Sequence, residues 1–169
     1  DSYLHRSTDG GVTWERLADL AAAGIENVHT MIVAPSWQRP GDVVIYLATR
    51  SGLWISDDSG SSFQQSPMEG IEARNFADVA VDPSDSRKVY VSVTDGLSHR
   101  STDGGRTFTQ MALQVAGGPD LTDRYRAAHL VAHPLLSGHL YLIPAAATMP
   151  MLTSHDDGAT WVSGRADKT

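Results

Sequence analysis

The chain has 169 residues, a formal net charge of −7 and no cysteine. The negative charge argues against a nucleic acid or an anionic membrane surface as the main partner, and the lack of cysteine excludes disulfides and thiolate metal sites. No apolar stretch approaches the ~20 residues of a membrane-spanning helix, so we expect no membrane insertion.

The first element along the chain is a turn pattern that recurs three more times. It reads Ser-x-Asp-x-Gly-x-(Thr/Ser)-aromatic, and its copies begin at residues 7, 56, 101 and 154. A period of about 40–50 residues with strand-like segments between the copies is typical of a propeller or solenoid array. The pattern therefore predicts a repeat protein.

The pattern, here called the box, describes a self-sufficient hairpin turn. The Ser and Asp side chains point to the same face, and we expect the Asp carboxylate to accept backbone N–H groups of the turn. The Gly suits a positive φ, and we expect the final aromatic ring to be largely buried. The structural box residues are Ser7, Asp9, Gly11, Trp14, Ser56, Asp58, Gly60, Phe63, Ser101, Asp103, Gly105, Phe108, Ser154, Asp156, Gly158 and Trp161.

The segments between the boxes predict the remaining strands of each repeat. Ahead of each later box come an apolar strand, a short turn, a strand that carries Tyr, and the strand that enters the box. We predict an all-β propeller segment with a half blade at 1–17 and four-stranded antiparallel blades at 28–65, 76–111 and 128–163, each box being the last hairpin turn of its blade. Closed propellers have about 4–8 blades. We therefore expect this segment to be completed by remaining blades of the same polypeptide or by another copy.

This arrangement resembles the Asp-box (bacterial neuraminidase repeat) proteins, which are β-propellers. Tandem boxes in this context are similar to the xyloglucanase-type glycoside hydrolases, the photosystem II assembly factors and the sortilin-type receptors, and the resemblance covers nearly the whole chain. It implies that a ligand binds on the face that carries the blade-to-blade connections, opposite the boxes. We expect an extracellular or periplasmic location.

The connection at residues 112–127 is the longest one predicted for that face, and long irregular connections are often functional. The binding candidates in this connection and in one neighbouring turn are Asp95, Asp120, Asp123, Arg124, Tyr125 and Arg126. Arg and Tyr are enriched at protein interfaces. We therefore favour a non-catalytic binding or scaffold module with a protein or glycan partner.

A glycoside hydrolase is the alternative, because the xyloglucanase resemblance implies a pair of catalytic Asp residues. Such a pair lies about 6.5–9.5 Å apart for inversion or about 5–5.5 Å apart for retention. Asp95, Asp120, Asp123, Glu69 and Glu72 are candidates, but none of them matches the family's catalytic motif. Sialidase activity is less favoured, because the family's N-terminal arginine motif is missing. We assign no catalytic residue.

The sequence also predicts no metal site and no cofactor. The boxes lack the Glu that an EF-hand calcium loop carries at its twelfth position. His129 and His133 have neither a third ligand nor the supporting residues of a zinc site.

Overall fold

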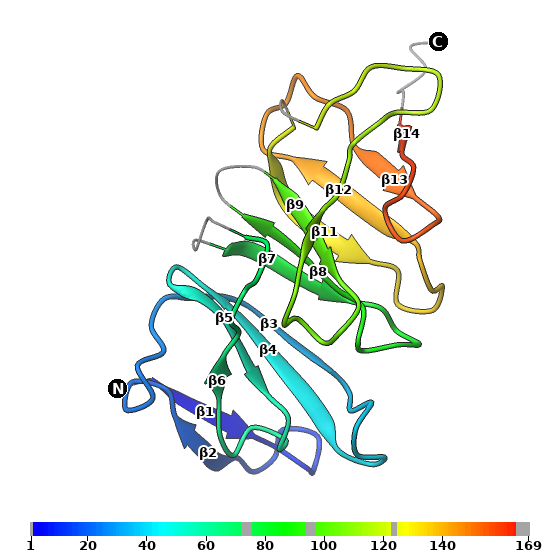
Figure 1. Ribbon diagram of the computed structural model, residues 1–169. Coiled ribbons are helices and arrows are strands. Elements are labelled where there is room, and N and C mark those ends of the chain that lie inside the picture. The colour runs from blue at the N-terminus through cyan, green and yellow to red at the C-terminus, as the bar shows by residue number, and fades with distance from the viewer. Residues whose placement is uncertain (1, 72–75, 94–96, 123–124, 165–169) are drawn as a thin grey trace.

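The computed structural model describes residues 2–71, 76–93, 97–122 and 125–164 and shows an all-β chain (Figure 1). A two-stranded sheet is followed by three four-stranded antiparallel sheets, in each of which the described strands are hydrogen-bonded in chain order. The predicted fold class is confirmed. Within the described part of the chain, no helix has the length and apolar character needed to cross a membrane.

The strands have the following bounds. The first sheet contains β1 (Tyr3–Arg6) and β2 (Glu15–Asp19). The second contains β3 (Val28–Pro35), β4 (Val43–Thr49), β5 (Gly52–Ser56) and β6 (Gln64–Gln65). The third contains β7 (Phe76–Val81), β8 (Val89–Val93), β9 (Ser98–Ser101) and β10 (Thr109–Gln110). The fourth contains β11 (Ala127–Ala132), β12 (Leu140–Pro144), β13 (Leu152–Ser154) and β14 (Val162–Ser163).

The core lies between neighbouring sheets, which pack face to face like the blades of a propeller (Figure 1). All five residues of β8 are buried, because sheets cover both of its faces. A strand covered on both faces favours a continuous apolar run over an alternating pattern. The last strand of each four-stranded sheet is short and exposed at the outer edge.

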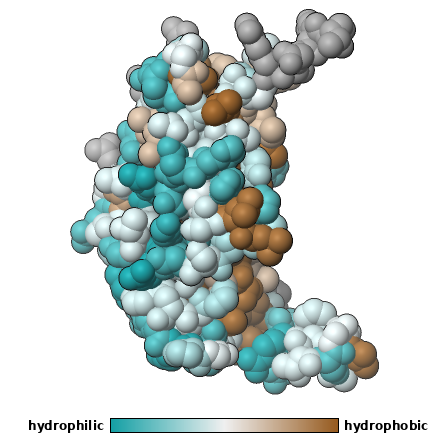
Figure 2. All heavy atoms as spheres, turned by 90° about the vertical axis from the view of Figure 1, so that its right-hand side faces the viewer, coloured by the Kyte–Doolittle hydropathy of each residue, from teal (hydrophilic) through white to brown (hydrophobic). Residues whose placement is uncertain are grey.

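Successive hairpin turns lie at opposite ends of the strands, which gives the molecule two distinct faces. The turns β3–β4, β7–β8 and β11–β12 share one end with the box turns, which we call the box face; it lies toward the lower right of Figure 1. The turns β4–β5 and β12–β13 lie at the other end, the opposite face. Figure 2, seen from the right-hand side of Figure 1, shows a mainly hydrophilic surface with separate apolar patches.

We expected the connections between sheets to lie on the opposite face, but parts of them leave it. The N–H of Phe108 donates to the carbonyl of Glu69 at 2.7 Å, and the N–H of Ala116 donates to the carbonyl of Trp161 at 2.8 Å. Each of these connections therefore runs beside the end of the next box. Met68 and Leu113, which belong to the connections, pack in the same clusters as Phe108 and Trp161 respectively.

This packing decides how deeply each box aromatic is buried. Trp161 is 0% exposed and Phe108 is 6% exposed, whereas Phe63 is half-buried and Trp14 is 64% exposed. The prediction of a largely buried ring is therefore wrong for Trp14. The connections that cover Phe108 and Trp161 have no counterpart over Trp14 among the described residues.

Candidate functional site

The box at residues 101–108 shows the hydrogen bonding that the pattern predicts. Ser101 Oγ donates to Asp103 Oδ1 at 2.7 Å and accepts the N–H of Gly105 at 2.9 Å. The Asp103 carboxylate also accepts the N–H groups of Arg106 and Thr107 and the hydroxyl of Thr107. Asp9, Asp58 and Asp156 each accept a backbone N–H four residues ahead in the same way.

These contacts hold the box carboxylates in the charged form. Burial opposes ionisation of Asp103, but hydrogen bonds from Thr107, Ser101 and Arg106 outweigh it and lower its pKa to about 2. Asp82, in the β7–β8 turn, behaves alike: burial raises its pKa, while hydrogen bonds from Gly138, Ser84 and Ser137 lower it to about 2. Such carboxylates are structural acceptors, poorly suited to donate a proton near neutral pH.

We expect the protein to lose stability in acid. The pKa values of Asp103 and Asp82 fall from 3.8 to about 2 on folding. The stability that these two ionised carboxylates give to the folded protein is therefore fully present above pH 3.8 and is lost as the pH falls through about 2. Urea unfolding at about pH 5, 3.5 and 2.5 measures this effect as a falling midpoint. A midpoint that stayed constant across this range would contradict it.

A charged network joins the third and fourth sheets. Lys88 Nζ lies 2.8 Å from Asp157 Oδ2, and the Tyr90 hydroxyl donates to Asp157 Oδ1 at 2.7 Å. Arg100 Nη1 donates to the Asp157 carbonyl at 3.2 Å. Burial, with Asp157 as the acceptor beside it, raises the pKa of the Tyr90 hydroxyl. These groups bridge the gap between two sheets.

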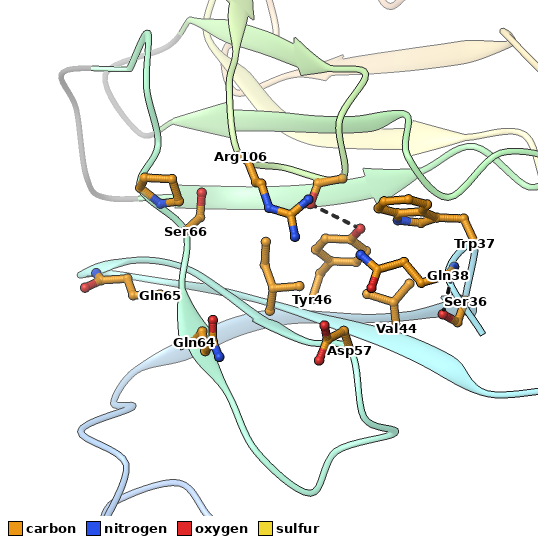
Figure 3. A pocket seen from close by; sticks show the side chains of 13 residues that line it. Ser36, Trp37, Gln38, Val44, Tyr46, Asp57, Gln64, Gln65, Ser66 and Arg106 are labelled. Carbon is orange, nitrogen blue, oxygen red and sulfur yellow. Dashed lines mark hydrogen bonds between the residues drawn. The ribbon is translucent and has the colours of Figure 1, made fainter.

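The corresponding gap between the second and third sheets is an open groove on the box side (Figure 3). Val44, Tyr46 and Ile55 are among its lining residues, but the side chains of Val44 and Tyr46 are buried. The side chains around it come from the β3–β4 turn (Trp37, Gln38), the second box (Asp57), β6 (Gln64) and the third box (Arg106). The groove is therefore built from both sheets.

Three residues that differ from their equivalents in the next repeat explain why no charged network fills this gap. Tyr46 pairs with Ile55 across β4 and β5, as Tyr90 pairs with Arg100 across β8 and β9. In this register Val44 takes the place of Lys88, and Gly104 takes the place of Asp157 after the box Asp. No ion pair between these positions can therefore join the second and third sheets. A Cβ at Gly104, whose φ is +78°, would lie 3.3 Å from Nε1 of Trp37.

Comparison with known proteins agrees with this repeat geometry. A family model described as BNR/Asp-box repeat matches residues 5–16. This chain is an Asp-box repeat protein. A xyloglucanase from Hypocrea jecorina (strain QM6a) is 34% identical over 122 residues, which are 70% of this chain and 13% of the relative.

Three solved structures share the fold. The GH74 xyloglucanase from Xanthomonas campestris has a TM-score of 0.63 and 16% identity, with 96% of this chain and 27% of that one covered. An ancestral GH74 enzyme has a TM-score of 0.61 and 21% identity, covering 80% and 18%. YCF48 from Cyanidioschyzon merolae has a TM-score of 0.54 and 16% identity, covering 80% and 37%. The Asp-box chain thus matches part of larger propellers.

The structure describes only three of the six binding residues predicted in this Asp-box protein, namely Asp120, Tyr125 and Arg126. Asp95, Asp123 and Arg124 lie outside the described residues, as does Glu72. The Asp120 carboxylate accepts the N–H and hydroxyl of Thr122 at 2.9 and 2.6 Å and so closes a local turn. Its role in binding stays a prediction.

Tyr125 corrects the prediction of an exposed aromatic anchor. Its side chain is buried in the core between the third and fourth sheets, and its hydroxyl donates to the carbonyls of Leu142 and Pro150 at 2.7 and 3.0 Å. Arg126 is exposed, and its Nη1 donates to the Tyr125 carbonyl at 3.3 Å. Of this pair, only the arginine side chain is exposed.

The connection at 112–127 is likewise more structural than predicted. Gln114 and Asp120 pair in an antiparallel bridge, so that the segment between them doubles back. Leu113, Val115 and Leu121 are buried in the core cluster that contains Trp161. These apolar residues are the signal that sequence reasoning missed, because they mark a connection that closes over a core.

The described histidines and acids do not assemble into a metal site: no three such side chains gather there. His129 Nδ1 lies 3.4 Å from Asp78 Oδ2. His133 Nδ1 accepts the N–H groups of Leu135 and Leu136, each at 3.1 Å. Both rings therefore already have local partners.

Proposed function

We propose that this Asp-box segment is a non-catalytic binding or scaffold module, which presents the face opposite the boxes to a protein or glycan partner. The observation that supports this most is the use made of the carboxylates. Most of those described hold turns or join sheets, as Asp103, Asp157 and Asp120 do. A glycosidase instead needs two carboxylates facing each other across a cleft.

We further propose that additional blades, of the same polypeptide or of another copy, cover the two outermost sheets. Ala80 and Val131 occupy the same register position, opposite Tyr90 and Tyr141. Ala80 is 4% exposed between two sheets, while Val131 on the outer face of the last sheet is 43% exposed. An apolar sheet face of this kind is normally covered in a propeller.

Part of a xyloglucanase-like glycoside hydrolase is the second candidate, with sialidase activity less favoured. The identity of 34% with a xyloglucanase supports it. The chain spans only 13% of that relative. The acidic residues of such a site would then come partly from outside this chain.

A hydrolysis assay on the full-length protein that carries this segment separates the two candidates. We expect that Asp95→Asn, Asp120→Asn and Asp123→Asn leave any turnover of xyloglucan or of a sialoside within about twofold of the parent. The unfolding midpoint of each variant is the folding control. Loss of turnover in a folded variant would replace the binding module with the hydrolase.

A further inference from the structure

We propose that the first box is a docking site for an extended, apolar chain segment that pairs with it in the parallel sense. The first sheet stands at one end of the row of sheets (Figure 1). The occupant to which we commit is a connection from a neighbouring blade of the same repeat type, and its origin rests on the proposal above that additional blades cover the outermost sheets. Two later boxes show how such a segment binds.

The third box is covered by the connection that follows β6. The N–H of Glu69 donates to the carbonyl of Arg106 at 3.2 Å, and its carbonyl accepts the N–H of Phe108 at 2.7 Å, which makes a parallel β-bridge. Met68 precedes this bridge and is buried in the same cluster as Phe108. A Cβ at Gly70, whose φ is +90°, would collide with the Phe108 carbonyl oxygen. The connection therefore lies directly against the box.

The fourth box repeats this contact with a different sequence. Val115 and Trp161 form a parallel β-bridge. The N–H of Trp161 donates to the carbonyl of Gln114 at 3.3 Å, and its carbonyl accepts the N–H of Ala116 at 2.8 Å. Leu113 and Val115 are buried in the cluster that contains Trp161. The two connections share an extended backbone and an apolar side chain beside the box ring.

The first box has the same pattern, but nothing covers it in the described part of the chain. Its ring, Trp14, is 64% exposed, and Val12 beside it is 82% exposed. The backbone N–H and carbonyl of Trp14 correspond to the paired groups of Trp161, yet they have no backbone partner among the described residues. An unpaired edge next to an exposed ring is therefore open to a further segment.

This combination of groups selects the class of partner. Backbone pairing with the edge holds an extended chain, and the exposed ring favours an apolar side chain beside it. Both covering connections run parallel to their box, so we expect the same direction at Trp14. A helix cannot fill the site, because its backbone N–H and C=O groups are already used within the helix.

The test titrates the 169-residue chain with a peptide of residues 112–122, the connection that covers the equivalent ring of Trp161. We expect binding with a Kd of about 5 mM or below, and a shift of the indole N–H signal of Trp14 in NMR spectra while that of Trp161 stays in place. A peptide with Leu113→Ser and Val115→Ser should bind at least about tenfold more weakly. Absence of binding by the unaltered peptide, or equal binding by both peptides, would overturn the proposal.

Matched variants of the chain locate the site. Trp14→Ala should weaken binding of the peptide at least about tenfold. Trp37→Ala, which removes an indole exposed elsewhere on the box face, should leave the affinity unchanged. Unchanged affinity in Trp14→Ala, or the same loss in both variants, would refute the assignment. Unfolding midpoints show that each variant is folded.

The full-length protein that carries this segment tests the origin of the occupant separately. Oxidation of Trp14 by N-bromosuccinimide, read by mass spectrometry, should be at least about fivefold slower there than in the 169-residue chain, because a covered ring is less accessible. If the peptide binds but Trp14 reacts equally fast in both proteins, the docking site stands and the proposal of a blade beside the first sheet fails. Dimerisation of the 169-residue chain that protects Trp14 would assign the site to a second copy and overturn the proposed occupant.

Discussion

Replacing Trp161 with Ala is expected to lower the free energy of unfolding by about 3–5 kcal/mol. The ring is 0% exposed and packs among the side chains that join the third and fourth sheets. Its removal leaves a cavity that the surrounding strands can fill only in part. The equivalent Trp14 is 64% exposed, and its replacement is expected to cost less than about 1 kcal/mol.

Urea unfolding of the two variants beside the parent protein measures this difference. Because both substitutions remove the same side chain from the same place in a box, their difference isolates the contribution of the covering connection. Similar losses for Trp14→Ala and Trp161→Ala would show that the box ring acts within its own turn and not through the neighbouring structure.

Replacing Asp103 with Ala is expected to destabilise the protein by about 1–3 kcal/mol, because the N–H groups of Arg106 and Thr107 lose their acceptor. The Thr107 hydroxyl and Ser101 lose a partner as well. Asp9→Ala is the matched variant. It removes the same kind of acceptor from the exposed first box, where water can replace it, and its effect should be smaller.

Equilibrium unfolding measures both variants, and binding of a partner is the second readout. Should Asp103→Ala abolish binding while leaving stability unchanged, the structural interpretation of the box would be wrong. If Asp9→Ala destabilised as much as Asp103→Ala, the burial of the third box would not contribute to its strength.

The hydrogen bonds of the boxes could be predicted from the sequence because they are local. The Asp103 carboxylate and its partners Ser101 and Thr107 lie within one turn. The repeat of that turn, with strand-like segments between its copies, was enough to predict four-stranded antiparallel sheets. Local geometry also favours Gly at the position that needs a positive φ.

Only the tertiary structure decided which of these local units are covered and where a cavity remains. Trp14 and Trp161 end the same pattern, yet one is exposed and one is buried, because burial depends on a connection from elsewhere in the chain. Tyr125 has the composition of an interface anchor, but its neighbours place it in the core. The lining of the groove beside Tyr46 is set by residues distant in sequence, because Val44 and Gly104 stand where Lys88 and Asp157 pair in the next gap. Contacts within one turn are specified by adjacent residues, whereas contacts between sheets depend on which segments pack against each other.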